Sequence, residues 1–231
     1  MTNLRIEYIQ PAPGVDPDRL RNHHVENHIQ PLLAQPGWQG ASRYELDNAT
    51  IGDIPNLLTI YYLDESASTE ADVEPPGEES DESLLSLWYI GYYRRSLVVG
   101  KNTYFGENSP PAIMVTLTFP NKGTPALGLN EWYDGHIGDI TTTDGFRGAA
   151  RYKLDEMILG YSSPYLAVYE LETDDIGQVA RNLDDNRDRW LSGDPSSRYY
   201  SSTGPMPETV HGERWIGVDG FAYYRLLESF G

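Results

Sequence analysis

The sequence contains one internal repeat, in which residues 22–65 align without a gap on residues 130–173 at a constant spacing of 108. The matched pairs are Asn22/Asn130, His28/His136, Gly37/Gly145, Arg43/Arg151, Tyr44/Tyr152 and Leu46/Leu154. Beyond them the register continues through Gly52/Gly160, Leu58/Leu166 and Tyr61/Tyr169. A register this long, with matched glycine, arginine and histidine, indicates a duplication. We therefore expect the chain to contain two related but unequal half-sites.

The length of the repeat limits the architecture. A spacing of 108 residues is too long for a solenoid unit, whose period is about 20–50 residues, and it fits a small domain of about 100 residues. The 231-residue chain is therefore predicted to contain a first repeat at residues 1–110 and a second at residues 111–231. An acidic insertion at residues 65–80 interrupts the first repeat, and a long loop at residues 191–220 interrupts the second.

The formal net charge of −18 argues against binding to nucleic acid or to an anionic membrane surface, because like charges repel. Residues 64–82 carry nine carboxylates and no lysine or arginine. The chain has no cysteine, which excludes disulfides, thiol catalysis and thiolate metal sites. A strand pattern begins where a signal peptide would lie, and no apolar run approaches the roughly 18 residues of a membrane span. We expect a soluble, cytoplasmic protein.

Both repeats show the same predicted order of elements. Helical spacing of apolar residues, as in Val25, Ile29 and Leu32, and alternation in the strands carry this prediction. In the first repeat strands are predicted at residues 4–9, 38–46, 57–63 and 102–105, and helices at 16–34 and 83–95. In the second repeat strands are predicted at residues 113–119, 145–154, 165–171 and 221–227, and helices at 129–140 and 176–190. This β-α-β-β-α-β order is that of a ferredoxin-like unit.

The second repeat carries a short motif that resembles a known family. Trp132-Tyr133-x-x-His136 is followed by a turn at Gly145-Phe146 and by Arg151 with its neighbouring tyrosine. In this respect the chain resembles EthD-like proteins of the dimeric α/β-barrel superfamily. The resemblance implies an α+β fold in which two fused ferredoxin-like repeats form a pseudo-dimeric α/β barrel, with four helices outside it. The fold hosts several chemistries, so the resemblance implies a small hydrophobic substrate and leaves the reaction open.

The repeated histidines are the first candidates for catalysis. His28 and His136 each precede a core isoleucine, so each lies at the edge of the buried helix face and can reach a cavity. Histidine titrates near neutral pH and can act as a general acid or base. Alternatively, both brace the turn that follows the helix. His24 lies one turn before His28, but the second repeat has Trp132 there, and we predict no metal site.

Aromatic and basic side chains complete the predicted site. Tyr133 and Tyr152 are candidate hydrogen-bond partners of the catalytic histidine, and Arg151 could bind an anionic oxygen. Arg151 and Arg43 could equally be paired to carboxylates. The predicted substrate-binding residues are Trp132, His24, Trp38, Phe146, Tyr169 and Trp215. The chain has 17 tyrosines and five tryptophans, and aromatic cavities suit flat hydrophobic ligands.

These observations favour a cofactor-independent enzyme that transfers protons on an aromatic or polyketide-like molecule, by cyclisation, dehydration, decarboxylation or isomerisation. Its active site is expected in the second repeat, which keeps the full motif. One alternative is a cofactor-free monooxygenase of the same fold. A second is haem binding through His136 or His211, and a third is a non-catalytic binding or stress protein. The pseudo-dimer could also pair with another copy into a homodimer.

Overall fold

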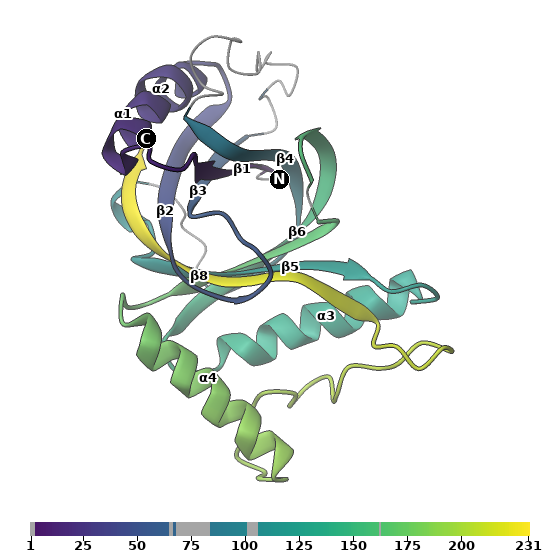
Figure 1. The fold of residues 1–231 in the computed structure, drawn as a ribbon. Helices are drawn as coiled ribbons and strands as arrows, with labels where there is room; N and C mark the ends of the chain where they lie inside the picture. Colours follow the sequence, from purple (N-terminus) through teal and green to yellow (C-terminus); the bar gives the residue numbers. More distant parts are fainter. Residues whose placement is uncertain (1–2, 65–66, 68–83, 101–105, 162) are drawn as a thin grey trace.

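The computed structural model describes residues 3–64, 67, 84–100, 106–161 and 163–231. Its strands close into one antiparallel barrel in the order β1-β3-β2-β8-β5-β7-β6-β4 (Figure 1). The strands are β1 (Asn3–Pro11), β2 (Trp38–Ile51), β3 (Leu57–Leu63), β4 (Leu85–Gly100), β5 (Ala112–Pro120), β6 (Phe146–Leu159), β7 (Tyr165–Leu171) and β8 (Ile216–Phe230). Each half of the chain contributes four neighbouring strands, and the closed ring confirms the predicted fold class.

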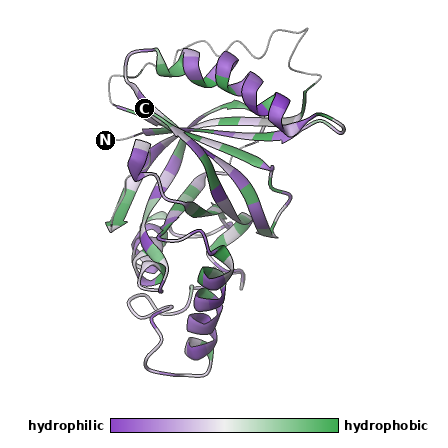
Figure 2. Cartoon of the chain, turned by 90° about the vertical axis from the view of Figure 1, so that its left-hand side faces the viewer, coloured by the Kyte–Doolittle hydropathy of each residue, from purple (hydrophilic) through white to green (hydrophobic). Residues whose placement is uncertain are grey.

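The helices cover two opposite sides of this barrel (Figures 1 and 2). In the first half α1 (Pro17–His24), the π-helical η1 (Val25–Ile29) and α2 (Gln30–Leu33) follow one another directly as one continuous helix. In the second half lie α3 (Ala126–Thr141) and α4 (Ile176–Leu191). Within the described residues, every helix is too short or too polar to cross a lipid bilayer.

The two halves repeat each other in their hydrogen bonds as well as in their sequence. The order β4-β1-β3-β2 of the first half matches β8-β5-β7-β6 of the second. The Leu46 amide donates to the Asn56 carbonyl at 2.7 Å, and 108 residues later the Leu154 amide donates to the Pro164 carbonyl at 2.9 Å. The molecule therefore has an internal approximate two-fold relationship.

Tyrosine side chains fill the barrel interior. On β1, Leu4, Ile6 and Tyr8 face inward, because strand residues alternate between the two faces of a sheet. They pack there with five further tyrosines from the other strands, namely Tyr44, Tyr62, Tyr93, Tyr152 and Tyr224. An eight-stranded barrel is just wide enough to be filled by its own side chains. A ligand site is therefore to be sought on the outer face, under the helices.

One predicted element is wrong. The helix predicted at residues 83–95 is strand β4 instead, which pairs with β1 and β6. Two leucines and a tryptophan imitate helical spacing there, but the segment is rich in aromatic residues, which favour strands. The strand predicted at residues 102–105 and most of the acidic insertion lie outside the described residues. Apart from the three-residue 3-10 helix η2 (Gly106–Asn108), the described part of the first half therefore has one helix where two were expected. Strands 57–63 and 165–171 are confirmed at their bounds.

Candidate functional site

A cavity of about 650 Å³ lies on the outer face of the second half, between the sheet, α3, α4 and the segment that leads to β8. Most of its wall is apolar or aromatic. The lining side chains that bear on function are Thr116, Thr118, Trp132, Tyr133, His136, Tyr169, Arg187, Tyr199, Tyr200 and Arg214. Pockets for flat small molecules have this composition, with few polar groups that fix orientation.

His136 is the titratable ring at the centre of an aromatic cluster in this cavity. Its ring centroid lies 4.8 Å from that of Trp132 and 4.9 Å from that of Tyr200, nearly parallel to both. Burial lowers the pKa of His136 to about 4, against the opposing influence of Asp139. Nδ1 of His136 is buried and has no hydrogen-bond partner among the described residues. The imidazole is therefore neutral at pH 7, and one of its two ring nitrogens can accept a proton.

Tyr133 brings a hydroxyl group to the same cavity. Its oxygen lies 3.3 Å from Oγ1 of Thr116, and the Thr118 hydroxyl donates to it at 3.5 Å. Behind the ring, the guanidinium carbon of Arg151 lies 4.5 Å from the Tyr133 ring centroid. Arg151 is in turn held by hydrogen bonds to Asp134 and to Asn130, each 2.9 Å long. Arg151 therefore fixes the position of Tyr133 and does not itself line the cavity.

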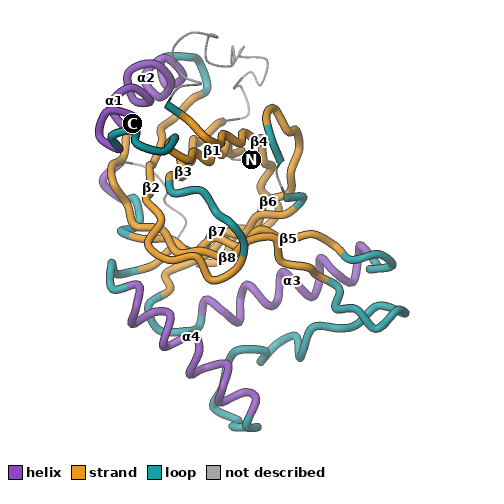
Figure 3. Tube along the Cα trace, viewed as in Figure 1, coloured by secondary structure: helices purple, strands orange, loops and turns teal. Residues whose placement is uncertain are grey.

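Residues 199–206, here called the strap, contribute to the cavity lining and pack on α3. They belong to the loop between α4 and β8 in Figure 3. The buried carboxylate of Asp139 accepts hydrogen bonds from the Ser201 hydroxyl at 2.9 Å, from the Ser202 amide and from the Thr203 hydroxyl at 3.3 Å. The Trp132 indole donates to the Gly204 carbonyl at 3.3 Å. These contacts hold the two strap tyrosines against His136.

The corresponding region of the first half is filled by a buried charge network. Arg5 pairs with Tyr61 across β1 and β3, as Met114 pairs with Tyr169 across β5 and β7. The same register places Glu7 where the cavity has Thr116, and the repeat places His24 at the position of Trp132.

Glu7 is fully buried at the centre of this network. It is paired with Arg5, its Oε2 lies 2.8 Å from Nε2 of His24, and it accepts the Tyr61 hydroxyl at 3.0 Å. Burial alone would raise the pKa of Glu7, but Arg5 and His24 outweigh it and lower the pKa to about 2. Beside this network the described residues leave a space of only about 10 Å³, lined in part by His23, His24 and His28.

The structure separates the predicted site residues into four groups. Trp132, Tyr133, His136 and Tyr169 line the cavity. Arg151, Phe146 and Trp215 lie close by without lining it, since Phe146 packs against Tyr169 and Trp215 lies over Gly128. Tyr152 lies inside the barrel, and the remaining three, His24, His28 and Trp38, belong to the opposite side of the molecule. The second half thus brings together one coherent part of the predicted set.

Several cavity residues escape prediction from the sequence. Thr116 and Thr118 lie two residues apart on β5, so both face the same side, but threonine is common in strands and gives no functional signal. Asp139 stands three residues after His136 on one helix face, a spacing that could have indicated a partner. Tyr199 and Tyr200 lie in a segment without periodicity, where no local pattern predicts their contact with α3.

The described residues do not fit a haem or a metal site. His211 is exposed near the tip of a turn, outside the cavity lining. A metal-ligating histidine usually donates its second ring nitrogen to a carboxylate or carbonyl, and the buried Nδ1 of His136 has no such partner in this part of the chain. No group of three or more histidines and carboxylates suited to a metal gathers among the described residues.

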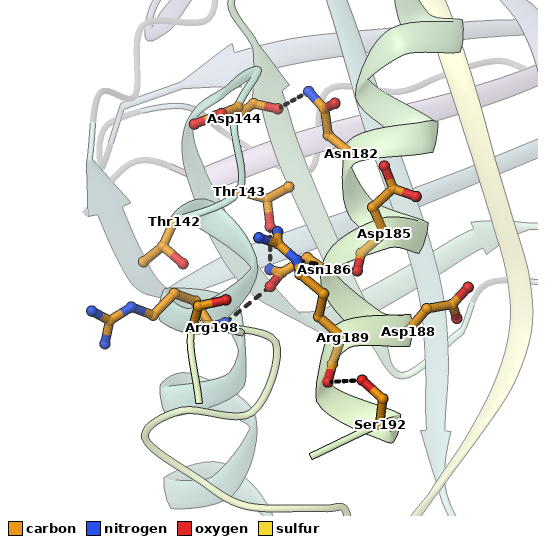
Figure 4. A pocket seen from close by; sticks show the side chains of 11 residues that line it. Thr142, Thr143, Asp144, Asn182, Asp185, Asn186, Asp188, Arg189, Ser192 and Arg198 are labelled. Atoms are coloured by element: carbon orange, nitrogen blue, oxygen red, sulfur yellow. Dashed lines mark hydrogen bonds between the residues drawn. The ribbon is translucent and has the colours of Figure 1, made fainter. Parts of the chain in front are cut away.

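A second hollow, about 750 Å³ and wider open, runs along α4 (Figure 4). Its lining is polar and of mixed charge, with Asp144, Asp185 and Arg198 among the residues. The buried Asn186 amide within it is satisfied internally, because it donates to the Thr143 hydroxyl and accepts the Arg198 amide, both at 2.9 Å. This hollow offers no aromatic wall and no histidine, so the 650 Å³ cavity is the better candidate.

No protein-family model matches the chain, and no curated protein matches it. Among solved structures, an anthrone oxidase-like protein superposes with a TM-score of 0.58 at 12% identity, covering 99% of this chain and 92% of that one. A candidate monooxygenase from Fusobacterium nucleatum subsp. nucleatum gives a TM-score of 0.57 at 8% identity, with coverages of 100% and 94%. A chlorite dismutase variant from Candidatus Nitrospira defluvii gives 0.51 at 12%, with 98% and 91%. At such identities these similarities show the shared α/β-barrel fold alone.

Proposed function

We propose that the chain is a cofactor-independent enzyme that removes a proton from a flat hydrophobic molecule, with His136 as the base. One observation carries the proposal. A neutral histidine stacked between aromatic rings opens onto a cavity of about 650 Å³, large enough for an aromatic or polyketide-like substrate. Neutral imidazole is the form that accepts a proton, and it is fully populated at pH 7.

The pKa of His136 limits the substrate. An imidazole whose pKa is about 4 is a weak base, so the proton must come from an activated position. A carbon conjugated with a carbonyl group, as in the methylene of a flat aromatic ketone, meets this condition, and so does an enol or phenol. Asp139, whose charge opposes the lowering of the pKa, would stabilise the imidazolium formed in the reaction.

The other polar groups fit complementary roles. Proton removal from such a carbon places negative charge on the substrate oxygen, which a hydroxyl donor stabilises. Tyr133 supports this role because its hydroxyl lies in the cavity wall beside Thr116 and Thr118. Arg151 over the opposite side of its ring adds positive charge behind the donor. Trp132 and Tyr169 would hold the substrate rings.

A second candidate is oxidation of the same carbanion by molecular oxygen. The apolar cavity walls support it, and so does the fold shared with an anthrone oxidase-like protein. In that reaction a methylene carbon flanked by aromatic rings becomes a carbonyl. One oxygen atom of O₂ enters the product, and the other leaves as water with the two methylene hydrogens. No further reductant is needed.

Anthrone is a suitable probe, because its methylene protons are acidic and its ring system is flat. Under nitrogen, exchange of these protons for deuterium should be faster with the protein than without it, and His136→Gln should abolish the increase. His211→Gln serves as the matched control, because that histidine is exposed and outside the cavity. In air, oxygen uptake equal to the anthraquinone formed would favour the oxygenase. Binding without exchange or oxygen uptake would identify a binding protein and contradict the proposal.

A further inference from the structure

We propose that the ligand of this cavity carries an anionic group, which Arg214 and Arg187 bind at the rim while the ring system lies against His136. The inference rests on the proposed role of the cavity as a ligand site. It adds a substrate class, an aromatic molecule with a carboxylate, sulfonate or ionised hydroxyl at one end.

Arg214 is anchored by its backbone while its side chain faces the cavity. Its carbonyl accepts the Asn121 side-chain amide at 2.7 Å, and it forms a strand bridge with Glu208. Among the described residues no carboxylate lies within ion-pair distance of its guanidinium group. A cationic group that is built into a cavity rim without a protein partner can bind an anion from outside.

This arrangement differs from that of the buried arginines. The buried Arg5, Arg43 and Arg151, and also the half-buried Arg147, are each paired to a carboxylate of the protein. The whole chain has 35 acidic against 17 basic side chains, so carboxylates are abundant. Arg214, by contrast, is exposed and has no carboxylate partner among the described residues, so its charge at the aromatic cavity is available to a ligand.

Arg187 reaches the same cavity from α4. Its guanidinium lies 3.0 Å from Asp184 and 3.3 Å from Asp188, and these pairs orient it along the helix. The charged groups in the lining are Asp184, Arg187 and Arg214, and His136 is neutral. Because Asp184 and Asp188 balance Arg187, Arg214 is the cation of the lining that a ligand anion would neutralise, and Arg187 is a second donor beside it.

The field of Arg214 extends into the aromatic part of the cavity. Burial raises the pKa of Tyr200, and Arg214 opposes this by favouring the ionised phenol. Burial likewise raises the pKa of Tyr199, and Arg214 again opposes this rise. The positive charge that favours an ionised phenol there would also favour an anionic group of a ligand near these rings. Apolar walls strengthen the attraction, because they exclude water that would screen it.

A pair of fluorescent dyes tests the inference. Anilinonaphthalenesulfonate and N-phenylnaphthylamine share their ring system and differ in the sulfonate group. With Arg214→Gln, the affinity for the sulfonate should fall about fivefold, the size of one exposed charge contact, and the affinity for the neutral dye should not change. The double variant Arg214→Gln with Arg187→Gln should bind the sulfonate more weakly still. Arg198→Gln, which removes an arginine from the polar hollow, should change neither affinity.

The site of dye binding is checked with Ala180→Phe, whose ring would fill part of the cavity. This variant should weaken both dyes strongly. If Arg214→Gln weakens both dyes equally or neither of them, while Ala180→Phe blocks both, the anion inference is wrong and the cavity is still a ligand site. If neither dye binds the wild-type protein, or both bind Ala180→Phe normally, the inference fails together with the proposed ligand cavity. Circular dichroism checks that each variant is folded.

Discussion

The backbone amide of Ser202 lies 3.1 Å from both carboxylate oxygens of Asp139. Asp139 is buried on α3, three residues after His136, and Ser202 lies in the strap that carries the aromatic rings of the cavity. One carboxylate therefore links the candidate base to the segment that encloses it. The position of the strap and the protonation of His136 depend on the same group.

Asp139→Asn should loosen the strap. The amide keeps one acceptor oxygen where the carboxylate has two, so hydrogen bonds to the strap are lost at a cost of about 1–3 kcal/mol in the free energy of unfolding. The pKa of His136 should fall further, because the carboxylate charge opposes its lowering. Urea unfolding and an NMR titration of the histidine measure the two effects. Asp144→Asn, at an exposed position, is the control. If neither the free energy of unfolding nor the pKa of His136 changed, the link between the strap and His136 through Asp139 would be contradicted.

Two glycines of α3 give a matched pair of substitutions. A Cβ atom at Gly135 would overlap Cγ2 of Thr203 in the strap, whereas a Cβ atom at Gly138 would meet nothing within 4 Å. Gly138→Ala should therefore stabilise the protein by about 0.5–1 kcal/mol, the ordinary helix preference of alanine. Gly135→Ala should show no such gain and should expose the strap to proteolysis. Equal protease resistance and stability of the two variants would show that the strap does not rest on Gly135.

The pH dependence of stability should carry a contribution from His136. Its pKa is lowered from 6.5 to about 4 on folding, so below pH 6.5 the unfolded chain binds a proton that the folded chain does not. Above pH 6.5 His136 does not reduce the free energy of unfolding, and this free energy decreases as the pH falls from 6.5 towards 4. Given its partial exposure, the loss should be on the order of 2 kcal/mol. Urea unfolding of the wild type and of His136→Gln at several pH values isolates this contribution, since the carboxylates are common to both proteins. If the free energies of unfolding of the two proteins changed with pH in parallel, the lowered pKa would be contradicted.

Glu7→Gln should be the most destabilising of these changes. It leaves the buried Arg5 without its counter-charge, and breaking a buried ion pair costs about 3–5 kcal/mol. Because the pKa of Glu7 is lowered from 4.5 to about 2, its contribution is present above pH 4.5 and is lost as the pH falls towards 2. Glu26→Gln, at an exposed helix position, is the control. A loss below 1 kcal/mol at pH 7 would show that the network does not stabilise the fold.

The repeat made most of the fold predictable. The matched register fixes which strands and helices correspond, and ten of the twelve predicted elements lie where expected. The missed element, β4, depends on pairing with β1 and β6, and such long-range contacts override a local pattern. Leu84 and Leu85 precede a tryptophan by four and three residues, a spacing that is compatible with a helix. The local sequence alone does not show the strand pairing that overrides it.

The candidate site was predictable only where the Trp-Tyr-x-x-His motif of the second repeat lies. His136, Trp132 and Tyr133, which line the cavity, belong to that motif. By contrast, Arg5 and Glu7 alternate with apolar residues on β1, a pattern typical of a strand with one solvated face. The helix of the first half covers that face, so both charges are buried. Which face a helix covers is decided by the whole topology, and the local sequence does not contain it.

Fusion of the halves into one chain allows the two-fold relationship to be broken. In a dimer of identical subunits every substitution occurs twice, so Glu7 in one half would require a glutamate in the other. Here one half has a charge network at the positions where the other has Met114 and Thr116. Each side can therefore be optimised separately, one for rigidity and one for the space that a guest molecule needs.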